Sequence, residues 1–117
     1  MTSKQITVDE KQVTLDKWLR DRFVDKLKEA SLMVNNTGKP LVLYRNILEE
    51  SGTAVQEEVG MVNEKYVVID VFTYGGFLPA SFQQQYVFTL YDFSIWIMRR
   101  SGELFFKCIN NLEDTLL

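Results

Sequence analysis

A single helical pattern near the N-terminus constrains the fold of this 117-residue chain more than any other feature. Within residues 15–34, apolar side chains recur at spacings of three and four, which brings them onto one side of an α-helix. They are Leu15, Trp18, Leu19, Phe23, Leu27 and Ala30. Thr14 is suited to cap the first turn, and Gly38 and Pro40 are suited to stop the helix. We therefore predict one long helix whose apolar side packs on a second layer.

Most of the chain after this helix is predicted to form strands. Residues 41–45 have the composition of a short strand, and residues 46–51 that of a single helical turn. The segment 53–61 is expected to pair, across a short turn, with residues 65–74, which are rich in β-branched and aromatic side chains. Short connections of this kind favour antiparallel pairing.

The C-terminal third is also predicted to be extended. Aromatic and β-branched side chains within residues 86–100 favour strand over helix. Gly102 accepts the backbone angles that a tight hairpin requires. We therefore expect a hairpin in which residues 95–100 pair with residues 103–109.

Both ends of the chain are expected to lie outside these elements. Residues 1–14 are interpreted as an extended arm or a short hairpin. Residues 110–117 are interpreted as a tail, in which Asn110 or Asn111 caps a last helical turn. The order of elements predicts a single α+β domain over residues 1–117, with one long N-terminal helix packed on a four- to five-stranded, mainly antiparallel sheet.

The predicted sheet has more apolar surface than one helix is expected to cover. Both faces of the strand at 65–74 carry apolar side chains, because successive residues point to opposite faces. Unless the helix covers all of them, a second apolar surface remains that is larger than most monomers leave in water. The side chains concerned are Tyr66, Phe72, Tyr74, Phe88, Trp96 and one of Phe105 and Phe106.

The sequence offers few groups for catalysis. It has no histidine, which removes the commonest general base and the commonest metal ligand. The single cysteine, Cys108, has no partner for an intrachain disulfide and is expected to be a buried, unreactive thiol in an apolar strand. No phosphate-binding glycine motif is present. We predict a non-catalytic protein without a metal site or a cofactor.

Two carboxylates in apolar segments leave an enzymatic alternative open. Asp70 and Asp92 would suit glycosidase-type chemistry if the fold held them about 5–9 Å apart. Exposure to solvent, or pairing with a nearby basic side chain, accounts for them more simply. We assign neither residue a catalytic role.

The charge balance argues against nucleic acid and membranes as partners. A net charge of −3 repels phosphate backbones and anionic membranes. An aromatic sheet face that binds single-stranded nucleic acid stays an alternative, with Arg99, Arg100 and Lys107 as its basic cluster. The longest apolar run, residues 86–98, is shorter than the roughly 20 residues of a membrane-spanning helix. The lone cysteine and the absence of a signal-peptide pattern predict a cytoplasmic protein, or one of the host cytoplasm or virion if phage-encoded.

The stretch VFTYGGFLPASF, residues 71–82, carries the functional hypothesis. Its glycines permit a bend, its proline stiffens the chain and its aromatic rings supply apolar area. Two interpretations stay open: a projecting loop that anchors a partner, or a loop that folds over the protein's own core. We predict a protein-protein interaction module, self-associating or binding another protein as an assembly component, adaptor or inhibitor. The predicted partner-binding residues are Tyr74, Phe77, Leu78, Phe82 and Trp96.

Overall fold

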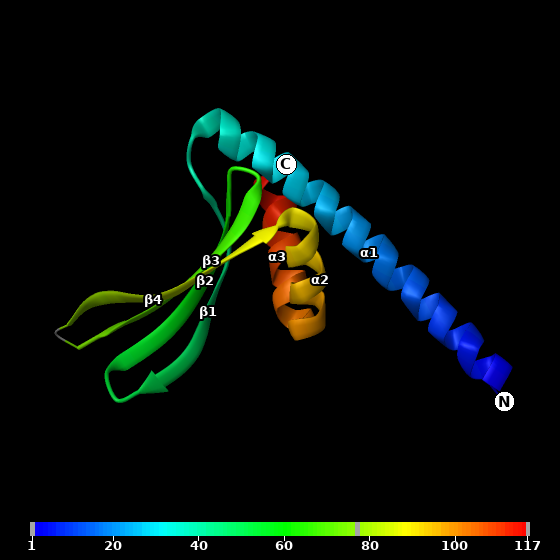
Figure 1. Ribbon diagram of the computed structural model, residues 1–117, viewed down its shortest axis with the longest axis horizontal. Coiled ribbons are helices and arrows are strands. Elements are labelled where there is room, and N and C mark those ends of the chain that lie inside the picture. The colour runs from blue at the N-terminus through cyan, green and yellow to red at the C-terminus, as the bar shows by residue number, and fades with distance from the viewer. Residues whose placement is uncertain (1, 77, 117) are drawn as a thin grey trace.

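In the part of the chain that the computed structural model describes, three helices lie on one side of a four-stranded sheet (Figure 1). The structure describes the backbone of residues 2–76 and 78–116 and the side chains of residues 16–76 and 79–116. The α+β class, the long N-terminal helix and the antiparallel sheet are confirmed. In chain order the elements are α1 (Thr2–Thr37), β1 (Leu41–Ser51), β2 (Ala54–Asn63), β3 (Tyr66–Gly75), β4 (Leu78–Thr89), α2 (Leu90–Arg100) and α3 (Gly102–Thr115).

Helix α1 confirms the strongest sequence prediction. It ends where expected, because Gly38 adopts a left-handed backbone (φ 72°) and donates its N–H to the carbonyl of Val34. Most of the predicted apolar stripe packs in the core, but Trp18 is exposed instead, with the guanidinium of Arg22 over its ring. The side chains of Thr14 and Leu15 lie outside the described residues.

The backbone of residues 2–14 continues α1, where we expected an extended arm or a short hairpin. The chain has no glycine or proline before Gly38, so no residue in this segment is suited to stop a helix. Apolar and polar residues do alternate near Ile6 and Val8, but the alternation is too short to outweigh the helix that follows.

The sheet is a meander with the order β1-β2-β3-β4, and every neighbouring pair is antiparallel. The predicted pairing of β2 with β3 is confirmed. The single helical turn expected at 46–51 is wrong, because these residues extend β1 and pair with β2 as far as the Ser51–Ala54 pair. The ladder to β2 satisfies backbone groups that one isolated helical turn would leave unpaired.

The hairpin expected in the C-terminal third is wrong as well, because residues 90–100 and 102–115 form α2 and α3. Thr89 caps α2 by accepting from the N–H of Asp92, and Ser101 caps α3 by accepting from the N–H of Leu104. Most apolar residues of both helices, although not Tyr91 and Phe106, pack in the core, and this packing outweighs their individual strand propensities.

The tail expected at 110–117 mostly belongs to α3, which continues to Thr115. Asn110 and Asn111 therefore lie inside a helix and do not cap one. Asn111 instead donates its side-chain amide to the carbonyl oxygens of Val42 and Leu43, both at 3.0 Å. This contact fastens α3 to the backbone of β1.

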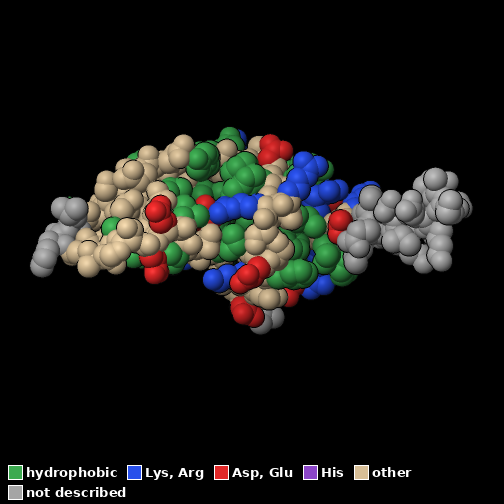
Figure 2. All heavy atoms as spheres, turned by 90° about the horizontal axis from the view of Figure 1, so that it is seen from below, with side chains coloured by type: hydrophobic (Ala, Val, Ile, Leu, Met, Phe, Trp, Pro, Cys, Tyr) green, Lys and Arg blue, Asp and Glu red, His purple; other side chains and the backbone are tan. Residues whose placement is uncertain are grey.

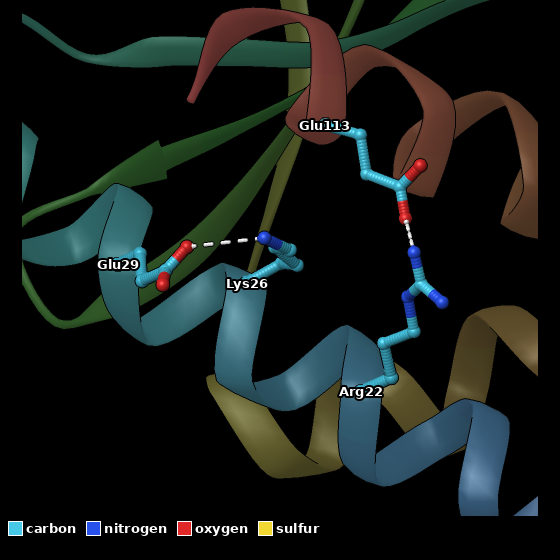
Figure 3. Close-up of polar contacts among 4 residues, drawn as sticks. All are labelled: Arg22, Lys26, Glu29 and Glu113. Carbon is cyan, nitrogen blue, oxygen red and sulfur yellow. Dashed lines mark hydrogen bonds and ion pairs between the residues drawn. The ribbon is translucent and has the colours of Figure 1, made fainter. Parts of the chain in front are cut away.

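The core lies between the helices and the half of the sheet nearest to them. Phe23 of α1 is its centre, with ring centroids 6.1 Å from Phe93 of α2 and 5.0 Å from Phe105 of α3. Outside the core, an ion pair between Arg22 and Glu113 joins α1 to α3 (Figure 3).

The other half of the sheet projects beyond the helices (Figure 1). The molecule measures 60 × 38 × 22 Å, and its radius of gyration of 17.0 Å exceeds the roughly 13 Å expected for a compact domain of this length. We call the half of the sheet farther from the helices the distal half: it comprises residues 46–57, 71–76 and 78–84.

Candidate functional site

One face of the sheet lies opposite the helices, and we call it the outer face. The register of the strands assigns residues to it, because directly paired residues share a face. It carries two mainly apolar rows that each cross all four strands. The first row is Val42, Met61, Val68 and Val87, and the second is Ile47, Glu57, Phe72 and Phe82.

The row between these two is mainly polar, and its polar side chains form hydrogen bonds or ion pairs with neighbours on the sheet. It consists of Arg45, Val59, Asp70 and Gln85. Arg45 forms an ion pair with Glu57 at 3.2 Å, and Gln85 donates to the carboxylate of Asp70 at 2.7 Å. Glu57 and Val59 are buried, so neighbouring side chains close over the centre of the outer face.

The exposed apolar side chains of the outer face lie at its margins, and the most exposed are on β4. Phe82 is 62% exposed and Val87 is 58% exposed. Tyr86, on the other face of the same strand, is exposed as well. Strand β1 also carries exposed apolar side chains, Val42, Ile47 and Leu48, but each is less exposed than Phe82 and Val87.

Strand β4 is also a free edge of the sheet. Residues 79–87 are exposed, and no charged residue occurs from Gly76 to Tyr91. Its pairing with β3 is irregular between Phe82 and Gln84 and again near the turn, and Pro79 lies in this first part of the strand, so only residues 84–89 form a regular, uncharged edge. An edge strand presents unpaired N–H and C=O groups to other chains, and natural proteins normally protect such edges with charges, bulges or cover.

The opposite edge, β1, has that protection. It carries Arg45, Glu49 and Glu50, and its register is irregular at two places. Asn111 occupies two of its carbonyl oxygens. On the face that Figure 2 shows, the Lys and Arg side chains lie over the centre and the helix side, while the distal half shows acidic side chains but no basic ones. The edge at β4 is therefore more accessible to a strand of another chain than the edge at β1.

The structure brings together two of the five predicted partner-binding residues. Tyr74 and Phe82 lie on the outer face, joined through Phe72, whose ring centroid is 5.9 Å from that of Tyr74. Phe77 lies outside the described residues, and so does the side chain of Leu78. Residues 71–75 and 78–82 are therefore parts of the paired strands β3 and β4 rather than of a separate loop.

A shallow hollow lies at this hairpin end. It has a volume of about 270 Å³ and is mostly apolar. Its lining residues are Ala54, Thr73, Tyr74, Gly75, Pro79 and Ser81. The hollow extends the exposed apolar surface of β4 toward the tip of the molecule.

Trp96 belongs to a different environment. It lies on α2, with its ring centroid 5.1 Å from that of Phe88, and the guanidinium of Arg100 stacks over it at 4.9 Å. Arg100 forms an ion pair with Glu58, which is only 5% exposed. Trp96 therefore packs on the arginine of an ion pair whose carboxylate is buried, and it does not join the outer face.

Two groups in the interior have shifted pKa values. Burial, reinforced by the charge of Glu58, raises the pKa of Tyr44 well above the ordinary value of a tyrosine. Burial also raises the pKa of Cys108 to about 12, which keeps its thiol neutral. Cys108 is buried as expected, although it lies in α3 rather than in a strand.

The two carboxylates singled out in the sequence do not share a site. Asp70 lies on the outer face, bonded to Gln85, whereas Asp92 lies in the first turn of α2. Asp92 lines an open groove of about 410 Å³ with Ile95, Trp96, Arg99 and Arg100. Within the described residues, no group of three or more Asp, Glu, Cys or His side chains is arranged to bind a metal ion.

Sequence reasoning missed Val87 and the free edge of β4. It assigned residues 75–82 to a loop and so did not recognise one continuous strand from Leu78 to Thr89. The uncharged run from Val71 to Tyr91 is the sequence signal of this strand, but it does not show that the strand lies at an edge.

A comparison of this chain with protein-family models, with curated proteins and with solved structures finds no match. Among the described helices, none combines the length and the apolar character needed to cross a membrane.

Proposed function

We propose that this protein is a non-catalytic protein-protein interaction module that binds through the free edge of β4 and the adjoining margin of the outer face. The observation that carries the proposal is an uncharged edge strand with nine consecutive exposed residues, 79–87. An added strand would pair with its backbone, and the side chains of the partner would cover Phe82 and Val87.

The area available supports a specific contact. Full burial of a side chain the size of Val or Phe is worth about 1.5–3 kcal/mol. Phe82 and Val87 keep more than half of their surface exposed, so covering both contributes roughly 2–3 kcal/mol in addition to the backbone hydrogen bonds. Tyr86 adds exposed apolar area to the same edge strand, on its other face.

A module of this kind suits an assembly component, an adaptor or an inhibitor. We place it in a reducing compartment such as the cytoplasm, because a buried, unpaired thiol suits such a compartment. The small size, mild acidity and lack of histidine also fit a phage-encoded protein, which would act in the host cytoplasm or the virion.

Nucleic-acid binding has less support. Arg99, Arg100 and Lys107 all lie on the helices, and Arg100 is engaged by Glu58. The aromatic side chains of β4 therefore lack the basic neighbours that a single-stranded nucleic acid requires.

Photo-crosslinking in the cells in which the protein naturally occurs tests the proposal, because it captures whichever protein lies against the photoreactive position. The photoreactive analogue benzoylphenylalanine replaces Phe82 in one variant and Phe106 in the control. Phe106 is 51% exposed but lies on α3, away from the free edge. We expect discrete protein adducts from position 82 and none from position 106. No adduct from position 82, or equal adducts from both positions, would contradict the proposed function.

A further inference from the structure

We infer, on the basis of the proposed function, that the partner at the free edge is a second copy of this chain. In this arrangement β4 pairs antiparallel with β4 of the copy, about a two-fold axis perpendicular to the sheet. The four-stranded sheets of the two copies then join into one continuous sheet of eight strands.

The charge pattern of β4 supports a second copy. In a two-fold pair of identical strands, residues near the axis face themselves or close neighbours, so a charged side chain there would face a like charge. The chain has 13 basic and 16 acidic residues, yet none lies between Gly76 and Tyr91. Gln83, Gln84 and Gln85 carry both a donor and an acceptor, so they are able to pair with their own kind.

The difference between the two edges predicts where assembly stops. Strand β1 is protected by its charges and by Asn111, whereas residues 84–89 of β4 carry no charge and pair regularly with β3, so each copy offers this part of β4 for pairing. When two copies join through β4, both free edges are used. The contact is therefore isologous and closes at a dimer, whereas pairing of β4 with β1 would propagate into a filament.

The shape of the molecule is compatible with this pairing. The helices cover the half of the sheet where β4 ends, and the distal half near its start is bare (Figure 1). Antiparallel pairing sets the end of one β4 beside the start of the other. The helix layer of each copy thus lies next to the bare distal half of its partner.

The geometry also restricts the register. Opposed residues of an antiparallel pair share a face, and faces alternate along each strand. Within residues 84–89, where the faces alternate without interruption, a two-fold axis perpendicular to the sheet therefore opposes only residues whose numbers sum to an even value. Outer-face Gln85 and Val87 oppose outer-face residues of the copy, and inner-face Gln84 and Tyr86 oppose inner-face ones.

Disulfide trapping of the purified full-length chain tests the pairing. Single cysteines are placed at Gln84, Gln85, Tyr86 and Val87, with Glu49→Cys on β1 as the control. Opposed Cα atoms in an antiparallel pair lie about 4.5–5.5 Å apart, within the range that a disulfide spans. The native thiol, Cys108, is buried and does not compete. We expect crosslinked dimers from one or two of the β4 variants and none from Glu49→Cys.

A matched pair of lysine substitutions measures the energetic role of the edge. Val87→Lys places two like charges near each other in the dimer, and both Val87 and the control residue Ile47 are exposed on the outer face. In sedimentation velocity, Val87→Lys is expected to weaken the dimer at least about tenfold, because like charges opposed across an interface are strongly unfavourable. Ile47→Lys is expected to leave dimerisation unchanged.

The outcomes separate this inference from the proposed function. A dimer that crosslinks from Glu49→Cys or survives Val87→Lys would overturn the β4 pairing, and growth into filaments would overturn its closure. A monomeric protein whose position 82 crosslinks to a different protein would refute the second copy and leave the proposed function standing. A monomer without any adduct from position 82 would refute both.

Discussion

Replacing Gly60 with alanine tests how β1 and β2 pack in the covered half of the sheet. Gly60 lies opposite Tyr44, and a Cβ added to Gly60 would lie 2.8 Å from Cδ1 and 3.0 Å from Cζ of the Tyr44 ring, and closer still to Cε1. The ring has little room to move, because Tyr44 is 2% exposed and stacks against Phe93 with centroids 6.5 Å apart. The substitution therefore forces a rearrangement of the core.

The expected cost follows from two opposing effects. Adding atoms to a well-packed core costs about 1–3 kcal/mol. Replacing glycine by alanine inside a strand recovers about 0.5–1 kcal/mol of backbone entropy, since Gly60 does not require a left-handed backbone. We expect a net loss of roughly 1–2 kcal/mol in the free energy of unfolding. For a domain of this length, that corresponds to a fall of roughly 4–8 °C in Tm.

Urea unfolding and thermal melting followed by circular dichroism measure this loss, and a double-mutant cycle assigns its cause. In a Tyr44→Ala background the obstructing ring is gone, so Gly60→Ala is expected to be neutral or stabilising. Gly102→Ala is the matched control, because a Cβ at Gly102 meets no atom within 4 Å. An unchanged Tm for Gly60→Ala, or an equal loss in both backgrounds, would refute the packing argument.

Two further predictions concern the interior. Arg100→Ala is expected to lower the free energy of unfolding by roughly 2–3 kcal/mol, because it leaves the carboxylate of Glu58 buried without its cation. Arg22→Ala breaks the more exposed pair with Glu113 and is expected to lower it by less than about 1 kcal/mol. Equal losses in urea titrations would contradict this difference. The pKa of Cys108 rises from 9.0 to about 12 on folding, so the stability that its neutral thiol contributes is complete below pH 9 and is lost as the pH rises toward 12. A thiol reagent at pH 8 should label Cys108 only after unfolding, and labelling of the native protein would contradict its burial.

The sequence by itself determined the helices and strands that are stabilised by interactions between residues close together in the chain. The helical periodicity of residues 15–34 and the stop at Gly38 depend on neighbours three and four positions apart. Strand β3 is rich in β-branched residues, and it pairs with β2 across a two-residue turn. These features were predictable because one segment, or two adjacent ones, supplies the interactions that stabilise them.

The C-terminal helices were decided by the tertiary structure. Residues 90–100 contain side chains that tolerate either helix or strand, and their choice depends on Phe93 and Ile97 reaching the core formed by α1 and the sheet. The caps at Thr89 and Ser101 assist that choice but are too short to be decisive as sequence signals.

The candidate site was also decided by the tertiary structure. The row of Val42, Met61, Val68 and Val87 draws one residue from each strand, so no local pattern contains it. The sequence by itself determined that β4 carries no charge and that a surplus of apolar side chains exists. Only the tertiary structure decided that this uncharged strand lies at an edge, because contacts between residues distant in sequence set the order of the strands. The same kind of contact places Asn111 of α3 against the backbone of β1 at the other edge.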